Sequence, residues 1–222
     1  MLIVFEGVDR CGKTTQAQML YRYLLSRNAD AELFREPGGT EISEQIRNIL
    51  KFGPANMYPL TQLLLFSAAR HELIKRKIEP VLERGGIVIL DRFWPSTYVY
   101  QGVLGGVSLR DAQLVTDMVV GDVHADVTFF IDVPASVALE RDTRVGEDHM
   151  EQIFIDNAEL AVMTYRNYAS QRAWVEIDGT RGVDDVHDHV CHYLATLNHY
   201  VPHLNLNPKG VPDAVEHAEE GD

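Results

Sequence analysis

The sequence contains few cysteines and no long apolar run, and both absences narrow the class of protein. Only Cys11 and Cys191 occur among 222 residues, so we expect neither a disulfide scaffold nor a cysteine-ligated zinc site. The longest aliphatic run, Ile87–Leu90, is far shorter than the roughly 20 residues that cross a bilayer. The amino-terminal residues also lack the basic start and cleavage site of a signal peptide. We therefore expect a cytoplasmic protein with no membrane partner.

Basic residues are also scarce, with 20 lysines and arginines against 33 acids and a formal net charge of −13. This balance is unlike that of a protein that grips a nucleic acid polymer through its phosphates, so we expect no such partner. A few convergent arginines can still hold a small nucleotide. The length and the 45% hydrophobic content suit one core, and we expect one domain over residues 1–200. Residues 201–222, with five acids and one lysine among prolines, are predicted to form a flexible acidic tail.

Five short apolar runs alternate with segments of helical spacing, which predicts an α/β fold with a parallel sheet flanked by helices. The predicted strands are Leu2–Phe5, Ala31–Phe34, Ile87–Leu90, Val127–Val133 and Trp174–Ile177. The predicted helices are Lys13–Ser26, Glu41–Leu50, Pro59–Glu83, Leu109–Val119, Ala135–Asp142, Met150–Arg172 and Val183–Tyr200.

Residues 7–14 match the G-x-x-x-x-G-K-[ST] pattern of a phosphate loop, between a predicted strand and a predicted helix. The glycines let backbone N–H groups and the positive end of the helix face an anion. Lys13 is expected to neutralise the β- and γ-phosphates, and the Thr14 hydroxyl to ligate Mg²⁺. We find no N-K-x-D guanine motif, which favours a kinase over a GTP-binding switch. The predicted ATP-binding residues of this segment are Gly7, Val8, Asp9, Arg10, Cys11, Gly12, Lys13, Thr14 and Thr15.

Five motifs in a fixed order carry a more specific signal. They are residues 5–16, 35–40 and 65–70, residues 91–93 together with Ser96 and 100–102, and residues 131–134. With these motifs the chain resembles the thymidylate kinase family over residues 1–199. The resemblance implies a five-stranded parallel sheet, nucleotides at the carboxyl ends of the strands, ATP and Mg²⁺ as cofactors, and a homodimer. It also implies transfer of the terminal phosphoryl group of ATP to dTMP, giving dTDP and ADP.

Several side chains are expected to bind the acceptor nucleotide. Phe66 and Arg70 are four residues apart and so share a helix face; the resemblance implies that they stack on thymine and bond the base. Arg35 and Arg92 follow predicted strands at the crevice of an open sheet, where forked guanidinium groups suit a phosphate. Tyr100 is expected to crowd the sugar 2′ position. The remaining acceptor-binding residues implied by the resemblance are Asp9, for the 3′-hydroxyl, with Pro37, Ser96, Thr97 and Gln101.

The acceptor phosphate is already ionised at neutral pH, so the reaction needs positioning and charge neutralisation rather than a general base. Asp91, at the end of a strand, is predicted to organise Mg²⁺ or to orient a neighbouring arginine. Residues 142–151 resemble the mobile lid of the family, with Arg141 predicted to grip ATP and Arg144 to assist catalysis. The predicted catalytic residues are Lys13, Arg10, Asp91, Arg92 and Arg144, and the predicted metal ligands are Thr14 and Asp91.

Two other functions stay open at this point. The acceptor could be another deoxynucleoside monophosphate, dUMP or a 5-substituted dUMP, because Pro95 and Tyr98 depart from common family residues. A non-catalytic ATP-binding module is less consistent with the retained charged residues. His187 and Cys191 have a spacing that could place two metal ligands on one helix face, but the surrounding valines and leucines predict an ordinary packing helix.

Overall fold

The computed structural model describes residues 1–54, 56–141 and 149–198. The sheet contains β1 (Leu2–Glu6), β2 (Ala31–Arg35), β3 (Ile87–Asp91), β4 (Val127–Asp132) and β5 (Val175–Asp178). All neighbours are parallel in the order β2-β3-β1-β4-β5, which confirms the predicted fold class and the five predicted strands. The predicted tail, most of the predicted lid and Arg144 lie outside the described residues.

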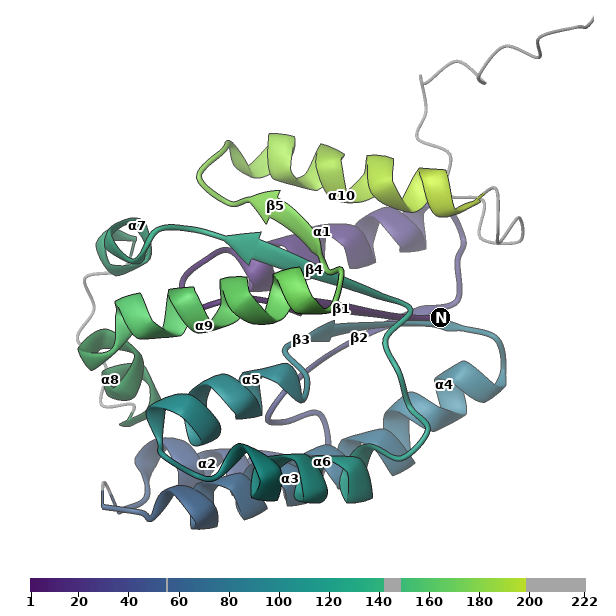
Figure 1. Cartoon of the computed structure of the whole chain (residues 1–222). Helices are drawn as coiled ribbons and strands as arrows, with labels where there is room; N and C mark the ends of the chain where they lie inside the picture. Colours follow the sequence, from purple (N-terminus) through teal and green to yellow (C-terminus); the bar gives the residue numbers. More distant parts are fainter. Residues whose placement is uncertain (55, 142–148, 199–222) are drawn as a thin grey trace, which may run out of the picture.

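Helices cover both faces of the sheet (Figure 1). They are α1 (Lys13–Ser26), α2 (Glu41–Phe52), α3 (Pro59–Leu73), the π-helix η1 (Ile74–Ile78), α4 (Glu79–Glu83), α5 (Pro95–Thr97), the π-helix η2 (Tyr98–Leu104), α6 (Leu109–Val120), α7 (Ala135–Glu140), α8 (His149–Asp156), α9 (Ala158–Gln171) and α10 (Val183–Asn198). Within the described parts of the chain, none of these helices combines the length and apolar character needed to cross a membrane.

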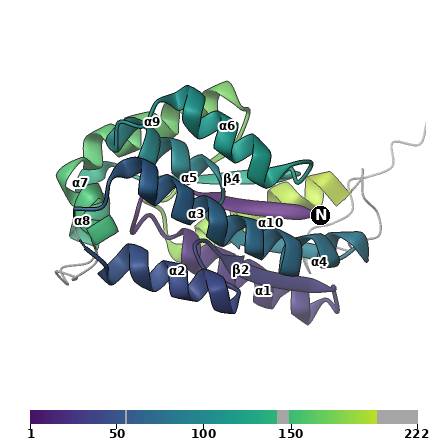
Figure 2. The same ribbon diagram turned by 90° about the horizontal axis from the view of Figure 1, so that it is seen from below.

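Strand side chains alternate between two apolar cores, as the period of two in an extended chain requires. Ile3 and Phe5 of β1 belong to the core that includes α1 and α10, whereas Leu2 and Val4 pack with α3, η1 and α4. In β4, Phe129 lies against Tyr193 of α10 while Phe130 stacks on Tyr165 of α9. Thus α9 covers the face opposite α10 (Figure 1). In Figure 1, α2, α3 and α6 lie below the sheet, and the view from below in Figure 2 shows α3 between α2 and α6.

The predicted helix Pro59–Glu83 is continuous but contains a π turn at Ile74–Ile78. Pro80 lacks an N–H group, and its ring would collide with the carbonyl four residues earlier in an α-helix. The wider π turn accommodates it. The short α5 and η2 helices were not predicted.

The prediction of one helix over Met150–Arg172 is wrong, because the chain breaks at Asn157. Asn157 leaves the helical conformation at φ −133° and ψ 24°, and its side-chain amide donates to the carbonyl of Ile153 at 2.9 Å. The apolar spacing continues through the break, which is why the pattern did not reveal it. The break turns α8 toward the loop that follows β1.

Candidate functional site

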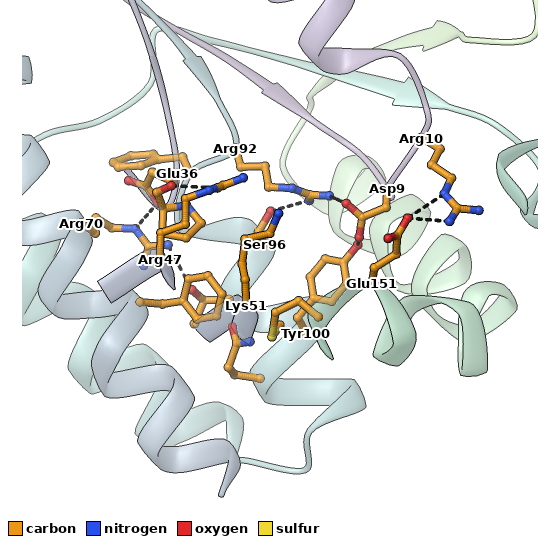
Figure 3. Close-up of a pocket in the computed structure, with 16 residues that line it drawn as sticks. Asp9, Arg10, Glu36, Arg47, Lys51, Arg70, Arg92, Ser96, Tyr100 and Glu151 are labelled. Carbon is orange, nitrogen blue, oxygen red and sulfur yellow. Dashed lines mark hydrogen bonds and ion pairs between the residues drawn. The ribbon is translucent and has the colours of Figure 1, made fainter. Parts of the chain in front are cut away.

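A pocket of about 310 Å³ lies beyond the carboxyl ends of β1, β2 and β3 (Figure 3). Parallel strands bring these ends to one edge: Asp91 pairs in register with Phe5 of β1 and with Arg35 of β2. The pocket is lined by Asp9, Arg10, Glu36, Pro37, Arg47, Lys51, Phe66, Arg70, Arg92, Phe93, Ser96, Thr97, Tyr100, Gln101, Met150 and Glu151. Most of the acceptor-binding residues predicted from the sequence therefore meet in one place.

The phosphate loop connects β1 to α1 along one side of this pocket. Gly7 and Gly12 have φ values of +144° and +105°, which only glycine adopts without strain. A Cβ atom on Gly7 would lie 2.7 Å from the Ile131 carbonyl oxygen. Lys13 is nearly buried and donates from Nζ to the Val8 carbonyl at 3.0 Å. The loop thus has the backbone shape that a phosphate-binding turn requires.

Arg10 has an unusual backbone and a carboxylate neighbour. Its φ is +65°, a conformation that costs a residue with a side chain about 1 kcal/mol or more. Its Nε and Nη2 atoms both donate to Oε1 of Glu151, at 3.1 Å and 2.5 Å. Glu151 comes from α8, so this ion pair joins the phosphate loop to a distant helix (Figure 3).

Arg92 occupies the centre of the pocket, directly after β3, with φ +71°. Its Nη2 donates to Oδ1 of Asp9 at 2.6 Å, and its guanidinium lies over the Tyr100 ring at 5.3 Å from the centroid. Tyr100 in turn donates to Oδ2 of Asp9 at 2.9 Å. Burial alone would raise the pKa of Asp9, but the charges of Arg92 and Lys13 and the Tyr100 hydroxyl outweigh it and lower that pKa to about 2. Asp9 is therefore ionised at every working pH.

Behind Arg92 lies a buried carboxylate. Glu6, fully buried at the end of β1, accepts from the backbone N–H of Phe93 at 2.8 Å, from Ser96 Oγ at 2.9 Å and from Tyr165 Oη at 3.1 Å. Arg92 Nη1 donates to the same two hydroxyl groups, at 3.0 Å and 3.1 Å. Burial raises the pKa of Glu6, opposed by the Arg92 charge. Ser96 and Tyr165 thus connect the buried carboxylate to Arg92.

The far end of the pocket holds Phe66 and a buried ion pair. Arg70, only 2% exposed, donates from Nε to Oε2 of Glu36 at 2.7 Å and from Nη2 to Thr97 Oγ1 at 3.1 Å. Burial raises the pKa of Glu36 to about 7 despite the opposing charge of Arg70. This end offers a planar ring, apolar walls and fixed hydrogen-bonding groups, which suit a heterocyclic base.

Thr14 and Asp91 meet beside the phosphate loop. Thr14 Oγ1 donates to Asp91 Oδ2 at 2.5 Å, while Asp91 Oδ1 is buried without a hydrogen-bond partner in the described residues. Hydroxyl and carboxylate oxygens are ligands that Mg²⁺ prefers, and Mg²⁺ commonly takes its other ligands from water and substrate phosphates. These two residues therefore fit a magnesium ion. No cluster of three or more His, Cys, Asp or Glu side chains that could hold a metal occurs in the described ranges.

Two other arginines and Thr15 differ in their placement. Arg35 is half exposed, and its Nη2 donates to both carboxylate oxygens of Glu44 at 2.9 Å. It is not among the described residues that line the pocket. Arg141 donates to the Cys11 carbonyl at 2.9 Å and to the Gly179 carbonyl at 2.6 Å, so it bridges the phosphate loop and the turn after β5. Thr15 is exposed at the start of α1.

The structure adds residues that were not singled out from the sequence. Glu6 and Glu36 belong to quoted motifs and Glu151 to the predicted lid, but they were given no role, and Tyr165 lies in α9, far along the chain. Arg47 and Lys51 of α2 also line the pocket (Figure 3). For Arg47 and Lys51, the only local signal was their spacing on one helix face.

The fold and this loop define a P-loop kinase of the nucleoside-monophosphate type. A family model described as thymidylate kinase matches residues 5–190. The chain is 36% identical to a thymidylate kinase of Thermoanaerobacter sp. (strain X514) over 187 residues, covering 83% of this chain and 92% of that protein. It is 38% identical to a thymidylate kinase of Chlorobium chlorochromatii over 205 residues, covering 86% and 92%.

A solved structure also supports this family assignment. The crystal structure of thymidylate kinase from Ehrlichia chaffeensis matches with a TM-score of 0.71 and 33% identity, over 88% of this chain and 98% of that chain. This chain belongs to the thymidylate kinase family.

Proposed function

We propose that the protein transfers the terminal phosphoryl group of ATP to dTMP, giving dTDP and ADP for deoxynucleotide synthesis. One observation carries the proposal: Asp9 and Arg10 belong to the phosphate loop and also line the pocket that holds Phe66 and Arg70. A donor held by the loop and an acceptor held by the pocket therefore bring their phosphates together at these two residues. Such juxtaposition is the main requirement for phosphoryl transfer.

On the donor side, residues 7–15 bind the ATP phosphates through backbone N–H groups and Lys13. Arg141 supports the outer side of this loop through its bond to the Cys11 carbonyl. Thr14 and Asp91 hold Mg²⁺, which supplies positive charge to the phosphate oxygens when it is bound. The proposed catalytic groups of the chain are Lys13, Arg10 and Arg92, with Asp91 and Arg144 in supporting roles.

On the acceptor side, Phe66 stacks on the base and Arg70, fixed by Glu36 and Thr97, bonds its edge. Pro37, Ser96 and Gln101 complete the walls. Tyr100 and Asp9 stand at the sugar, and Arg92 binds the acceptor phosphate. Arg35, which is paired with Glu44 at the surface, acts on the phosphate only after leaving that partner.

The chemistry then needs no proton acceptor, because the attacking phosphate oxygen is already ionised. Lys13 and Arg92 supply positive charge that their neighbours fix before the substrates arrive, and Arg10 adds its charge to the transferring group. Such preorganised charge is commonly the largest contribution to a rate enhancement.

We further propose a homodimer formed through α2, α3 and α6. Exposed apolar side chains lie on these adjacent helices (Figure 2): Ile42, Ile49, Phe52, Leu60, Leu64, Leu114 and Met118. Exposed apolar side chains gathered on adjacent helices are typical of a subunit interface. Leu64→Glu should shift the mass measured by light scattering toward the monomer, whereas Met163→Glu, exposed on α9, should not. Equal behaviour of the two variants would remove this interface from the proposal.

The experiment that tests the activity compares kcat/KM for dTMP, dUMP, dCMP and dGMP with ATP and Mg²⁺. We expect a clear preference for dTMP, and loss of dTMP-dependent ADP formation in Lys13→Ala. A preference for dUMP or a 5-substituted dUMP would replace the named substrate. Absence of any monophosphate-dependent ADP formation in correctly folded protein would instead indicate a nucleotide-binding module.

A further inference from the structure

The ion pair between Arg10 and Glu151 sits at the junction of the donor and acceptor sites. Both side chains line the acceptor pocket, yet Arg10 belongs to the loop that faces ATP. Their side chains are only 11% and 23% exposed. Two nitrogen atoms of Arg10 converge on one oxygen of Glu151, which fixes the direction of the guanidinium.

A carboxylate in this place is costly once phosphates arrive. The acceptor brings a phosphate dianion into the pocket that Glu151 lines, and ATP brings further negative charge along the neighbouring loop. Like charges in a partly desolvated site repel strongly. Arg10, in contrast, gains a new anionic partner. The arrival of the acceptor phosphate therefore favours exchange of the Arg10 ion pair from Glu151 to a phosphoryl oxygen.

We propose that Glu151 is a positioning residue that holds Arg10 away from the phosphoryl group of ATP until the acceptor phosphate enters. The proposal rests on the proposed function, since it presumes a phosphate-bearing acceptor in this pocket. Glu151 thereby suppresses transfer of the phosphoryl group to water. In that side reaction a water oxygen attacks the γ-phosphorus, the bond to the ADP oxygen breaks, and ADP, inorganic phosphate and a proton are released.

The exchange is suited to a reversible device because one ion pair replaces another. Arg10 stays paired in both states, and the charge left without this partner is that of Glu151, whose side chain is 23% exposed. The exchange needs a movement of the Arg10 side chain and no change in the loop backbone, which is already held at φ +65°. A ligand shifts such an equilibrium by as much as its affinity for the two states differs.

The test compares two rates in the full-length protein: phosphate release from ATP alone, and ADP formation with saturating dTMP. Glu151→Gln keeps the shape of the side chain but removes its charge. We expect the ratio of the first rate to the second to rise about tenfold, as suits the loss of one charge-assisted contact. Glu159→Gln, exposed in the next helix, is the matched control and should leave the ratio unchanged. A Glu151→Gln ratio equal to that of the wild type overturns the proposal.

Two further variants separate positioning from folding. In an Arg10→Ala background, Glu151→Gln should no longer change the ratio, because the group that it releases is gone. Glu151→Asp, which keeps the charge at a shorter reach, should give an intermediate ratio. A purely structural role lowers both rates together and leaves the ratio constant, which would refute the proposal. If the wild-type protein prefers another monophosphate, the same ratio is measured with that acceptor, so failure of the proposed substrate is recognised separately.

Discussion

The Tyr165 hydroxyl of α9 lies 3.1 Å from a carboxylate oxygen of Glu6, a residue 159 positions earlier in the chain. The same hydroxyl accepts from Arg92. A buried carboxyl group at the end of β1 is therefore linked to the positive charge at the centre of the acceptor pocket.

Tyr165→Phe removes that hydroxyl but keeps the ring that stacks on Phe130. We expect KM for dTMP to rise about fivefold to tenfold with a smaller change in kcat, because Arg92 loses one positioning contact of ~1–2 kcal/mol. Steady-state kinetics and denaturant unfolding check this. Tyr168→Phe, in the same helix and packed on Tyr98, is the control. Equal effects of the two variants would contradict a specific role of the hydroxyl.

Glu36 should make the free energy of unfolding decrease as pH rises, which is the reverse of the usual effect of a carboxylate. Its pKa in the folded protein, about 7, is above its ordinary value of 4.5, so between these values the folded state binds more protons than the unfolded state. The free energy of unfolding should therefore fall as pH rises from about 4.5 to 7, by up to ~3 kcal/mol from this group. Glu36→Gln should flatten that slope in urea unfolding series. A wild-type slope that the variant retains would assign the titration to another group.

Asp9 should instead make the free energy of unfolding decrease as pH falls. Its lowered pKa, about 2, stabilises the folded protein above its ordinary pKa of 3.8, and this contribution is lost as pH falls from about 4 to 2. Asp9→Asn should thus reduce the loss of stability across that acidic range. Unfolding monitored by circular dichroism at pH 2 to 5 measures the difference. An unchanged acidic slope would count against the Arg92 and Tyr100 contacts as its cause.

Arg10 and Arg141 should affect different kinetic constants. We expect Arg10→Ala to lower kcat about 10²-fold to 10³-fold, as loss of a group that neutralises charge in the transition state does. Arg141→Ala should mainly raise KM for ATP, because Arg141 braces the phosphate loop from outside. Initial rates at varied ATP and dTMP separate the two. An Arg10→Ala variant with full turnover would exclude Arg10 from catalysis.

Gly7 should tolerate no side chain. Gly7→Ala would place a Cβ atom 2.7 Å from the Ile131 carbonyl oxygen and 2.8 Å from Cys11 Sγ, at φ +144°. We expect a thermal midpoint several degrees lower, from a loss of at least ~1–3 kcal/mol, and weak ATP binding. Gly85→Ala is the matched control, since its φ is +78° but nothing lies within 4 Å. Similar losses in both variants would attribute the effect to backbone strain rather than to the collision.

The strands and α1 could be predicted because their apolar runs report burial directly. The break at Asn157 could not, since Phe154, Ala158 and Ala161 keep a helical spacing across it and the break depends on one backbone angle and one side-chain bond. Local sequence therefore predicted the five strands and the order of the elements better than the division of the longest helices.

The residues of the site also differ in whether the local sequence reveals their role. Lys13, Phe66 and Arg92 lie in short motifs whose chemistry can be read locally. Tyr165 and Glu151 meet the site through contacts that span 159 and 141 positions. Glu151 falls at the end of the predicted lid, but nothing near either residue indicates its partner. Only the fold brings such residues together.

The break at Asn157 also lets the two helices on either side of it, α8 and α9, position different residues of the site. On its carboxyl side, α9 is anchored in the core and keeps Tyr165 against Glu6. On its amino side, α8 carries Glu151 to the phosphate loop. A displacement of α8 can then be absorbed by the backbone of Asn157 alone. The partner of Arg10 can change while the contact between Tyr165 and Arg92 stays constant. An unbroken helix would transmit every such displacement to both arginines at once.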